Sequence, residues 1–182
     1  EKWDINYIKE NKKGNLFHKS LLTEFIPQWC IKQLDENEKD LWSLRNLVSV
    51  LEDSDSLPYR LYELRWDNFI TIAHKGTLTK DSCFNIMSKL SDKLEEMCGD
   101  NIEYRMFFTT EEFTVRDGHH NHLFLRIGNY NYRECALEYI QDAFANCQID
   151  IQSYDSDKGG LFYICKGGLE GTDWDYRHNL KA

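Results

Sequence analysis

Hydrophobic residues recur along the chain with two different periods, and these periods predict its secondary structure. Strands are expected over residues 66–73, 102–113, 120–127 and 149–154, where aromatic and β-branched residues gather. A helix is expected from residue 79 or 81 to 98, and a second one around residues 135–143, because apolar positions recur there at three- and four-residue steps. A turn at Asp117-Gly118 joins two of the strands, and a brief helix is expected between residues 157 and 167.

This order of elements predicts the fold class. The sequence β-α-β-β-α-β is typical of an α+β, ferredoxin-like arrangement, in which an antiparallel sheet carries helices on one face; here a short helix carrying a tyrosine follows. Residues 1–58 are predicted to form a helical N-terminal extension, and the linker-like run EDSDSLP at 52–58 separates it from residues 59–182. Because the chain starts at Glu1 rather than Met, we expect it to be a segment of a longer protein.

Composition narrows the classes of function. The chain of 182 residues has 22 Lys and Arg against 31 Asp and Glu, a net charge of -9. This balance argues against nucleic-acid binding through a broad basic face, but it leaves room for a short basic groove or a metal-assisted phosphate site. The six cysteines show no C-x-x-C spacing, so reduced thiols in an intracellular protein are expected. No apolar run approaches the roughly 18 residues of a membrane span, and no membrane partner is expected.

The triplet His120-Asn121-His122 is the first candidate for chemistry. Residues two apart on a strand point to the same face, so both imidazoles can reach one divalent cation. A carboxylate at the end of the preceding strand would complete the ligand set: Glu112 is the first choice, and Glu111 replaces it if the register slips by one residue. The alternative is an incidental surface pair of histidines. A structural zinc site is disfavoured, since no cysteine has zinc-like spacing.

The second candidate is Tyr163 with Lys166, which share one face of the short predicted helix. A phenol is a poor nucleophile at its ordinary pKa, but beside a metal-polarised phosphate and an ammonium group its oxygen can attack phosphorus. The alternative is that Tyr163 belongs to the core and that Lys166 only complements the negative end of the helix.

Taken together, these motifs make the chain resemble the HUH endonucleases, the catalytic domains of rolling-circle replication initiators (Rep). Three family motifs match over about residues 65–170: a strand with aromatic and hydroxyl residues at 69–72; Glu112 eight residues before His120-Asn121-His122, which follows the turn at Asp117-Gly118; and Tyr163–Gly167, of the form Y-x-x-K-G. It looks most like the single-tyrosine initiators of circular single-stranded DNA viruses and plasmids. The middle residue of the histidine motif is usually hydrophobic in this family, whereas here it is Asn121. By strand parity, the side chain of Asn121 should face away from the metal.

The resemblance implies an enzyme that nicks one DNA strand at an origin. Tyr163 would attack the scissile phosphate and remain joined to the 5′ phosphate, assisted by Lys166 and by Mg²⁺ or Mn²⁺ held by His120, His122 and Glu112. The implied partners are single-stranded or hairpin DNA, replication proteins and, if the parent protein continues, a helicase domain. The location would be the bacterial cytoplasm or a host nucleus. Two alternatives stay open: a single-tyrosine transposase or relaxase, and a non-catalytic ferredoxin-like nucleic-acid or protein adaptor.

DNA recognition by such a protein would be local, because the chain as a whole is acidic. Cationic side chains in a groove and aromatic rings that stack on unpaired bases would supply it. The residues expected in this role are Arg65, Trp66, Lys75, Arg105, Arg126 and Tyr130.

Overall fold

The computed structural model describes residues 54–113, 116–165, 169 and 171–180, together with residues 37, 38, 41, 45, 48 and 52. The chain divides into two compact units, Glu1–Trp42 and Ser43–Ala182. Most of the expected N-terminal extension lies outside the described residues. The expected boundary at residue 58 falls within helix α4 (Leu57–Tyr62), whose Leu61 is buried in the second unit. Among the helices of the described segments, none has the length and apolar character needed to cross a membrane.

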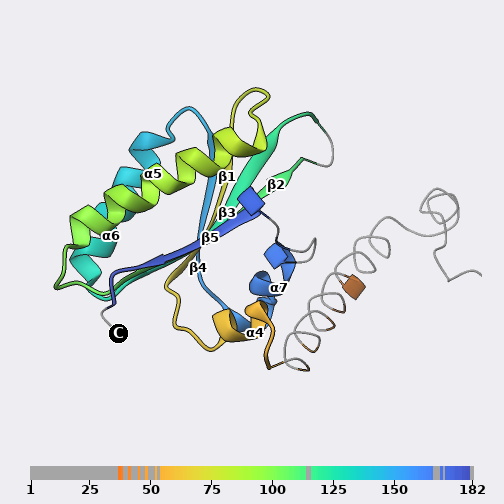
Figure 1. Cartoon of the computed structure of the whole chain (residues 1–182), viewed down its shortest axis with the longest axis horizontal. Helices are drawn as coiled ribbons and strands as arrows, with labels where there is room; N and C mark the ends of the chain where they lie inside the picture. Colours follow the sequence, from red (N-terminus) through yellow and green to blue (C-terminus); the bar gives the residue numbers. More distant parts are fainter. Residues whose placement is uncertain are drawn as a thin grey trace, which may run out of the picture. The chain divides into compact units, whose positions relative to one another are not determined.

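The centre of the second unit is a sheet of five antiparallel strands (Figure 1). Its strands are β1 (Asn68–Ala73), β2 (Tyr104–Glu112), β3 (His119–Ile127), β4 (Gln148–Ser153) and β5 (Trp174–His178), in the order β4-β1-β3-β2-β5. The architecture is therefore α+β and compatible with the ferredoxin-like fold, which confirms the predicted fold class. Strand β5, which pairs with β2 at the sheet edge, was not predicted. Its sequence WDYRH mixes polar and aromatic residues, so its pairing with β2 gives it its extended form.

Two long helices cover one face of the sheet (Figure 1). Helix α5 (Lys80–Cys98) is capped by Thr79, and helix α6 (Tyr130–Ala143) is capped by Asn129; each cap side chain accepts hydrogen bonds from the first turn. The main hydrophobic core lies between these helices and the sheet. Its fully buried strand residues are Ile70, Ile72, Tyr104, Met106, Phe108, Leu123, Leu125 and Ile127.

The opposite face of the sheet carries a second, smaller hydrophobic cluster. The short helices α4 and α7 (Gly160–Cys165) contribute to it. Its buried members are Leu61, Trp66, Phe107, Phe124, Leu161 and Ile164. Two 3₁₀ turns, η1 (Ser156–Lys158) and η2 (Gly171–Asp173), lead into α7 and β5. Asp155 caps η1, and α7, the helix expected between residues 157 and 167, begins at Gly160.

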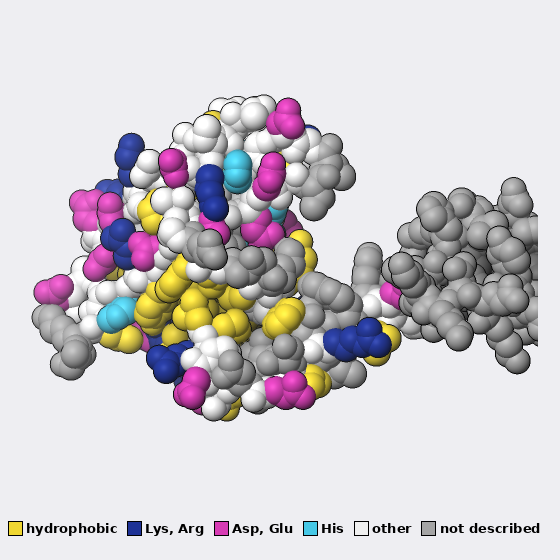
Figure 2. Space-filling view, turned by 45° about the vertical axis from the view of Figure 1, so that its right-hand side comes forward, with side chains coloured by type: hydrophobic (Ala, Val, Ile, Leu, Met, Phe, Trp, Pro, Cys, Tyr) yellow, Lys and Arg dark blue, Asp and Glu magenta, His cyan; other side chains and the backbone are white. Residues whose placement is uncertain are grey.

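Charged side chains are dispersed over the visible surface. Lys and Arg side chains stand apart from one another among acidic ones on the face in Figure 2, where an apolar area is also visible. No broad basic face is visible in that view, in agreement with the net charge of -9.

A buried amide ties the middle of β3 to its neighbours from the helix-covered side. Asn121 is 0% exposed, and its Oδ1 accepts a hydrogen bond of 2.7 Å from Nε2 of His74. Its Nδ2 donates to the carbonyl of Thr109 at 3.1 Å and to Oγ1 of Thr110 at 2.9 Å. As strand parity predicts, Asn121 faces away from the neighbouring histidines. Its polar character is explained by three hydrogen bonds to buried groups.

We predict that Asn121→Leu lowers the free energy of unfolding by about 1–3 kcal/mol, because it leaves buried groups of His74 and Thr110 without their partner. Urea unfolding followed by circular dichroism measures the change. Asn101→Leu, the same substitution at an exposed turn, is the control and should stay within about 0.5 kcal/mol of the original chain. Equal stability of the two variants would contradict the structural role of the buried amide.

Candidate metal centre

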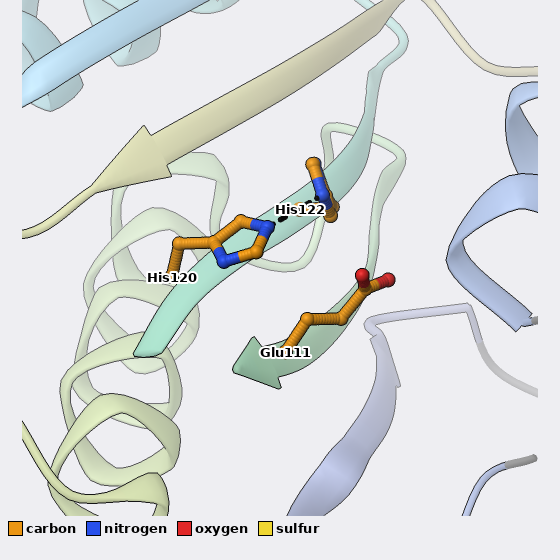
Figure 3. A group of neighbouring side chains, drawn as sticks. All are labelled: Glu111, His120 and His122. Carbon is orange, nitrogen blue, oxygen red and sulfur yellow. Dashed lines mark hydrogen bonds between the residues drawn. The ribbon is translucent and has the colours of Figure 1, made fainter. Parts of the chain in front are cut away.

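The β2–β3 hairpin brings two histidines and one glutamate together. In its antiparallel register Glu111 lies opposite His120, and Thr109 lies opposite His122. Side chains alternate between the faces of a strand, so Glu111, His120 and His122 project from the same face. This is the face opposite α5 and α6, since Met106 and Phe108 of β2 point into the core beneath those helices. Figure 3 shows the three side chains converging at the end of the hairpin.

The distances fit one cation. One ligand atom from each of the three residues lies within 4.8 Å of the other two. Nε2 of His120 is 3.0 Å from Nε2 of His122, so without an ion one ring donates its N–H to the other. Two adjacent ligands, each about 2.1 Å from an octahedral ion, are separated by about 3.0 Å. Two imidazoles and a carboxylate would leave coordination positions of one divalent cation open.

Aromatic rings restrain both histidines. The ring of His122 stacks on Phe69, with centroids 5.6 Å apart, and His122 is only 5% exposed. The ring of His120 stacks on Phe113 at 4.8 Å, and the guanidinium of Arg116 covers that phenyl ring at 3.6 Å from its centroid. These contacts fix the planes of both imidazoles and shield His122 from water.

Tyr163 lies beside this group. Its ring meets that of His122 edge-on, with the centroids 5.5 Å apart. Helix α7 places it there, because Leu161 and Ile164 of the same helix are buried in the second hydrophobic cluster. The thiol of Cys165, on the same helix, is close enough to be affected by Glu111. Burial and, to a smaller extent, the negative charge of Glu111 raise the pKa of this thiol to about 12. The two imidazoles, the carboxylate and the phenol thus share one side of the sheet.

The structure corrects the choice of carboxylate. Glu112, the first choice from the sequence, lies opposite His119 and is exposed. It has the parity of Tyr104, Met106 and Phe108, which is the helix-covered side of β2. The alternative, Glu111, is the residue that joins His120 and His122. Lys166 lies outside the described residues, so its expected position beside Tyr163 stays a prediction.

The residues expected to bind DNA are dispersed. Trp66 is 7% exposed, and its indole N–H donates to the carbonyl of Leu61 at 2.8 Å, so the expected base-stacking role is corrected to a core role. Arg65, Lys75 and Tyr130 are exposed. Of these three, only Lys75 follows the end of β1 that pairs with His120, whereas Arg65 and Tyr130 flank the far ends of their strands.

Two of the expected cationic residues already have acidic partners. Arg105 is 8% exposed and forms an ion pair with Glu103. Arg126 forms ion pairs with Asp67 at 2.9 Å and with Glu103 at 3.1 Å. The hydrogen bond from Arg105 holds the pKa of Glu103 below its ordinary value. Both arginines therefore pair with carboxylates at the end of the sheet away from His120, and the expected DNA groove lined by them stays a prediction.

Sequence reasoning assigned no individual role to the residues of β1, yet two of them contact the site. Phe69 stacks on His122, and Oγ1 of Thr71 lies 2.9 Å from Nδ1 of the same ring. The loose match of residues 69–72 to a family motif was the available signal. The contacts themselves result from the antiparallel pairing of β1 with β3, which sets Thr71 opposite His122.

We predict that Glu111→Gln weakens Mn²⁺ binding by roughly tenfold or more, because a neutral amide replaces the one anionic ligand. Mutation of an outer-shell partner of a metal ligand typically costs roughly tenfold already, and Glu111 is a candidate direct ligand. Glu112→Gln is the matched control and should bind Mn²⁺ as tightly as the original chain. Isothermal titration calorimetry of the two variants measures the difference. A larger loss in Glu112→Gln would show that the register assigned to the metal centre is wrong.

The resemblance to HUH endonucleases rests on the three sequence motifs and stays a prediction. No protein-family model, curated protein or solved structure matches the chain.

Proposed function

We propose that this protein is a metal-dependent endonuclease and strand transferase that cleaves single-stranded or hairpin DNA through a 5′-phosphotyrosine link, as an initiator of rolling-circle replication does. The observation that carries the proposal is the edge-on contact of Tyr163 with His122, at 5.5 Å between ring centroids, beside the group of Glu111, His120 and His122. Nucleophile and metal ligands are thus near neighbours on one face of the sheet.

The donor set fits a hard divalent cation with open positions. His120, His122 and Glu111 would hold it, and their side chains come from adjacent strands of a rigid hairpin. When bound, Mg²⁺ or Mn²⁺ would neutralise charge on the scissile phosphate and orient it. Stacking of the imidazoles on Phe69 and Phe113 keeps the ligands in place before the ion arrives, which reduces the entropy lost on binding.

The proposed reaction is a transesterification. The phenolic oxygen of Tyr163 attacks phosphorus, the new O–P bond forms, and the bond from phosphorus to the 3′ oxygen breaks. The proton lost by the phenol balances the proton gained by the leaving 3′ hydroxyl. A later attack by a 3′ hydroxyl on the phosphotyrosine reverses these steps and rejoins the strand. Since one ester replaces another, no nucleotide triphosphate is consumed.

Other tyrosines near the sheet are less suited to this role. Burial raises the pKa of Tyr154 to about 12, and its ring packs edge-on against Phe124 at 5.3 Å. Tyr104 is 0% exposed, lies on the helix-covered side of the sheet and forms a hydrogen bond of 2.7 Å with Ser91. Tyr163 is only partly buried and contacts a candidate metal ligand.

The net charge of -9 bears on the substrate. An acidic protein gains little from long-range attraction to a polyanion, so its contacts with DNA must be short-ranged and salt-sensitive. An unpaired strand suits this situation, because it can bend to bring one phosphate to the site without laying a whole duplex against acidic surface. We therefore propose single-stranded or hairpin DNA as the substrate class.

The test is formation of a covalent adduct. We predict that the original chain, incubated in Mn²⁺ with a random-sequence pool of single-stranded and hairpin oligonucleotides, gives a protein–DNA species that survives denaturing electrophoresis. Mass spectrometry should place the link on the peptide that contains Tyr163, and removal of the metal with EDTA should abolish the species. Tyr163→Phe should give no detectable adduct, because it lacks the nucleophilic oxygen.

Tyr154→Phe is the matched control, since it removes a phenolic oxygen from the neighbouring part of the same face and should leave adduct formation intact. Persistence of the adduct in Tyr163→Phe would overturn the assignment of the nucleophile. Failure of the original chain to form any adduct with the pool would favour the non-catalytic adaptor over the nuclease.

A further inference from the structure

A hydroxyl group on β1 contacts one candidate metal ligand from behind. Oγ1 of Thr71 lies 2.9 Å from Nδ1 of His122, while Nε2 of the same ring points toward His120. Thr71 and His122 are direct partners in the antiparallel register of β1 and β3, so the backbone of two central strands fixes their separation. The two nitrogens of His122 thus have separate tasks: one faces the metal centre and the other faces Thr71.

The protonation state of the ring links these tasks. A neutral imidazole carries one N–H, and a ring that offers the lone pair of Nε2 to a metal must carry its proton on Nδ1. That Nδ1–H then donates to Oγ1 of Thr71. A partner of this kind fixes both the tautomer and the orientation of a ligating histidine, and it increases the basicity of the ligand.

We propose that Thr71 is the positioning residue of the metal centre: it holds His122 in the tautomer and the ring plane that direct Nε2 to the ion. This inference rests on the metal-binding half of the proposed function and adds a residue to it. It is independent of whether Tyr163 attacks DNA.

The neighbouring strand supplies a comparison. Thr109 of β2 lies opposite His122 on its other side and is 1% exposed. Within the described residues, its hydroxyl is buried and forms no hydrogen bond. Two threonines therefore flank His122 in one row of the sheet, and only Thr71 forms a hydrogen bond with its ring. Replacing each hydroxyl by a methyl group separates the hydrogen bond from the effect of packing beside the ring.

We predict that Thr71→Val weakens Mn²⁺ binding by about 10–100-fold, measured by isothermal titration calorimetry without DNA. Valine keeps the shape and the strand preference of threonine but leaves Nδ1 without its partner. Thr71→Ser restores a hydroxyl and should bind within about threefold of the original chain, a small fraction of the typical outer-shell loss. Thr109→Val should bind as the original chain does. Thermal melting without metal checks that each variant folds, and if Thr71→Val does not fold, Thr71→Ala is compared with Thr71→Ser.

Unchanged affinity in the variants that lack the Thr71 hydroxyl, or an equal loss in Thr109→Val, would overturn the positioning role. Absence of Mn²⁺ binding by the original chain would overturn the metal centre and the positioning role together. If the original chain binds Mn²⁺ and the Thr71 series behaves as expected but no DNA adduct forms, the nuclease proposal alone fails.

Discussion

The antiparallel register of β2 with β3 is the constraint on which the candidate site depends. It sets Met106 opposite Leu125 and Phe108 opposite Leu123, and all four side chains are fully buried beneath the helices. A slip of one residue would turn these apolar side chains to the other face, at a cost of several kcal/mol of buried surface. The same slip would separate Glu111 from His120. Packing of the core therefore fixes the geometry of a group that takes no part in the core.

The two faces of the sheet have separate roles. The face under α5 and α6 holds the larger hydrophobic core, and Asn121 ties that side of β3 to β2 and to His74. The opposite face packs against the short helices α4 and α7, and it carries the histidines, the glutamate and Tyr163. This division lets polar ligands stay accessible to an ion while the strands beneath them remain rigid.

Neighbouring strands and rings restrain the candidate ligands. Thr71 and Phe69 contact His122 from β1, and Phe113 stacks on His120 from the end of β2. Long-range electrostatic attraction would contribute little to the binding of a phosphate, because the chain is acidic. Arg105 and Arg126, at the far end of the sheet, form ion pairs with carboxylates. In the proposed function, affinity for a phosphate would then come from the bound cation and from short-range contacts. The carboxylate that would hold the cation is itself one of the acidic residues that make the net charge negative.

The sequence by itself determined the order of strands and helices from β1 to α7, the α+β class, and the placement of His120 and His122 on one face. These follow from local periods, since a strand repeats every two residues and a helix every 3.6. The tertiary structure alone showed that Glu111, and not Glu112, joins the histidines. It also revealed the burial of Trp66, the ion pairs of Arg105 and Arg126, the edge strand β5 and the contact of Thr71 with His122. A local period fixes parity within one strand but not the offset between two strands. That offset, like the burial of a ring or a charge, depends on packing between residues far apart along the chain.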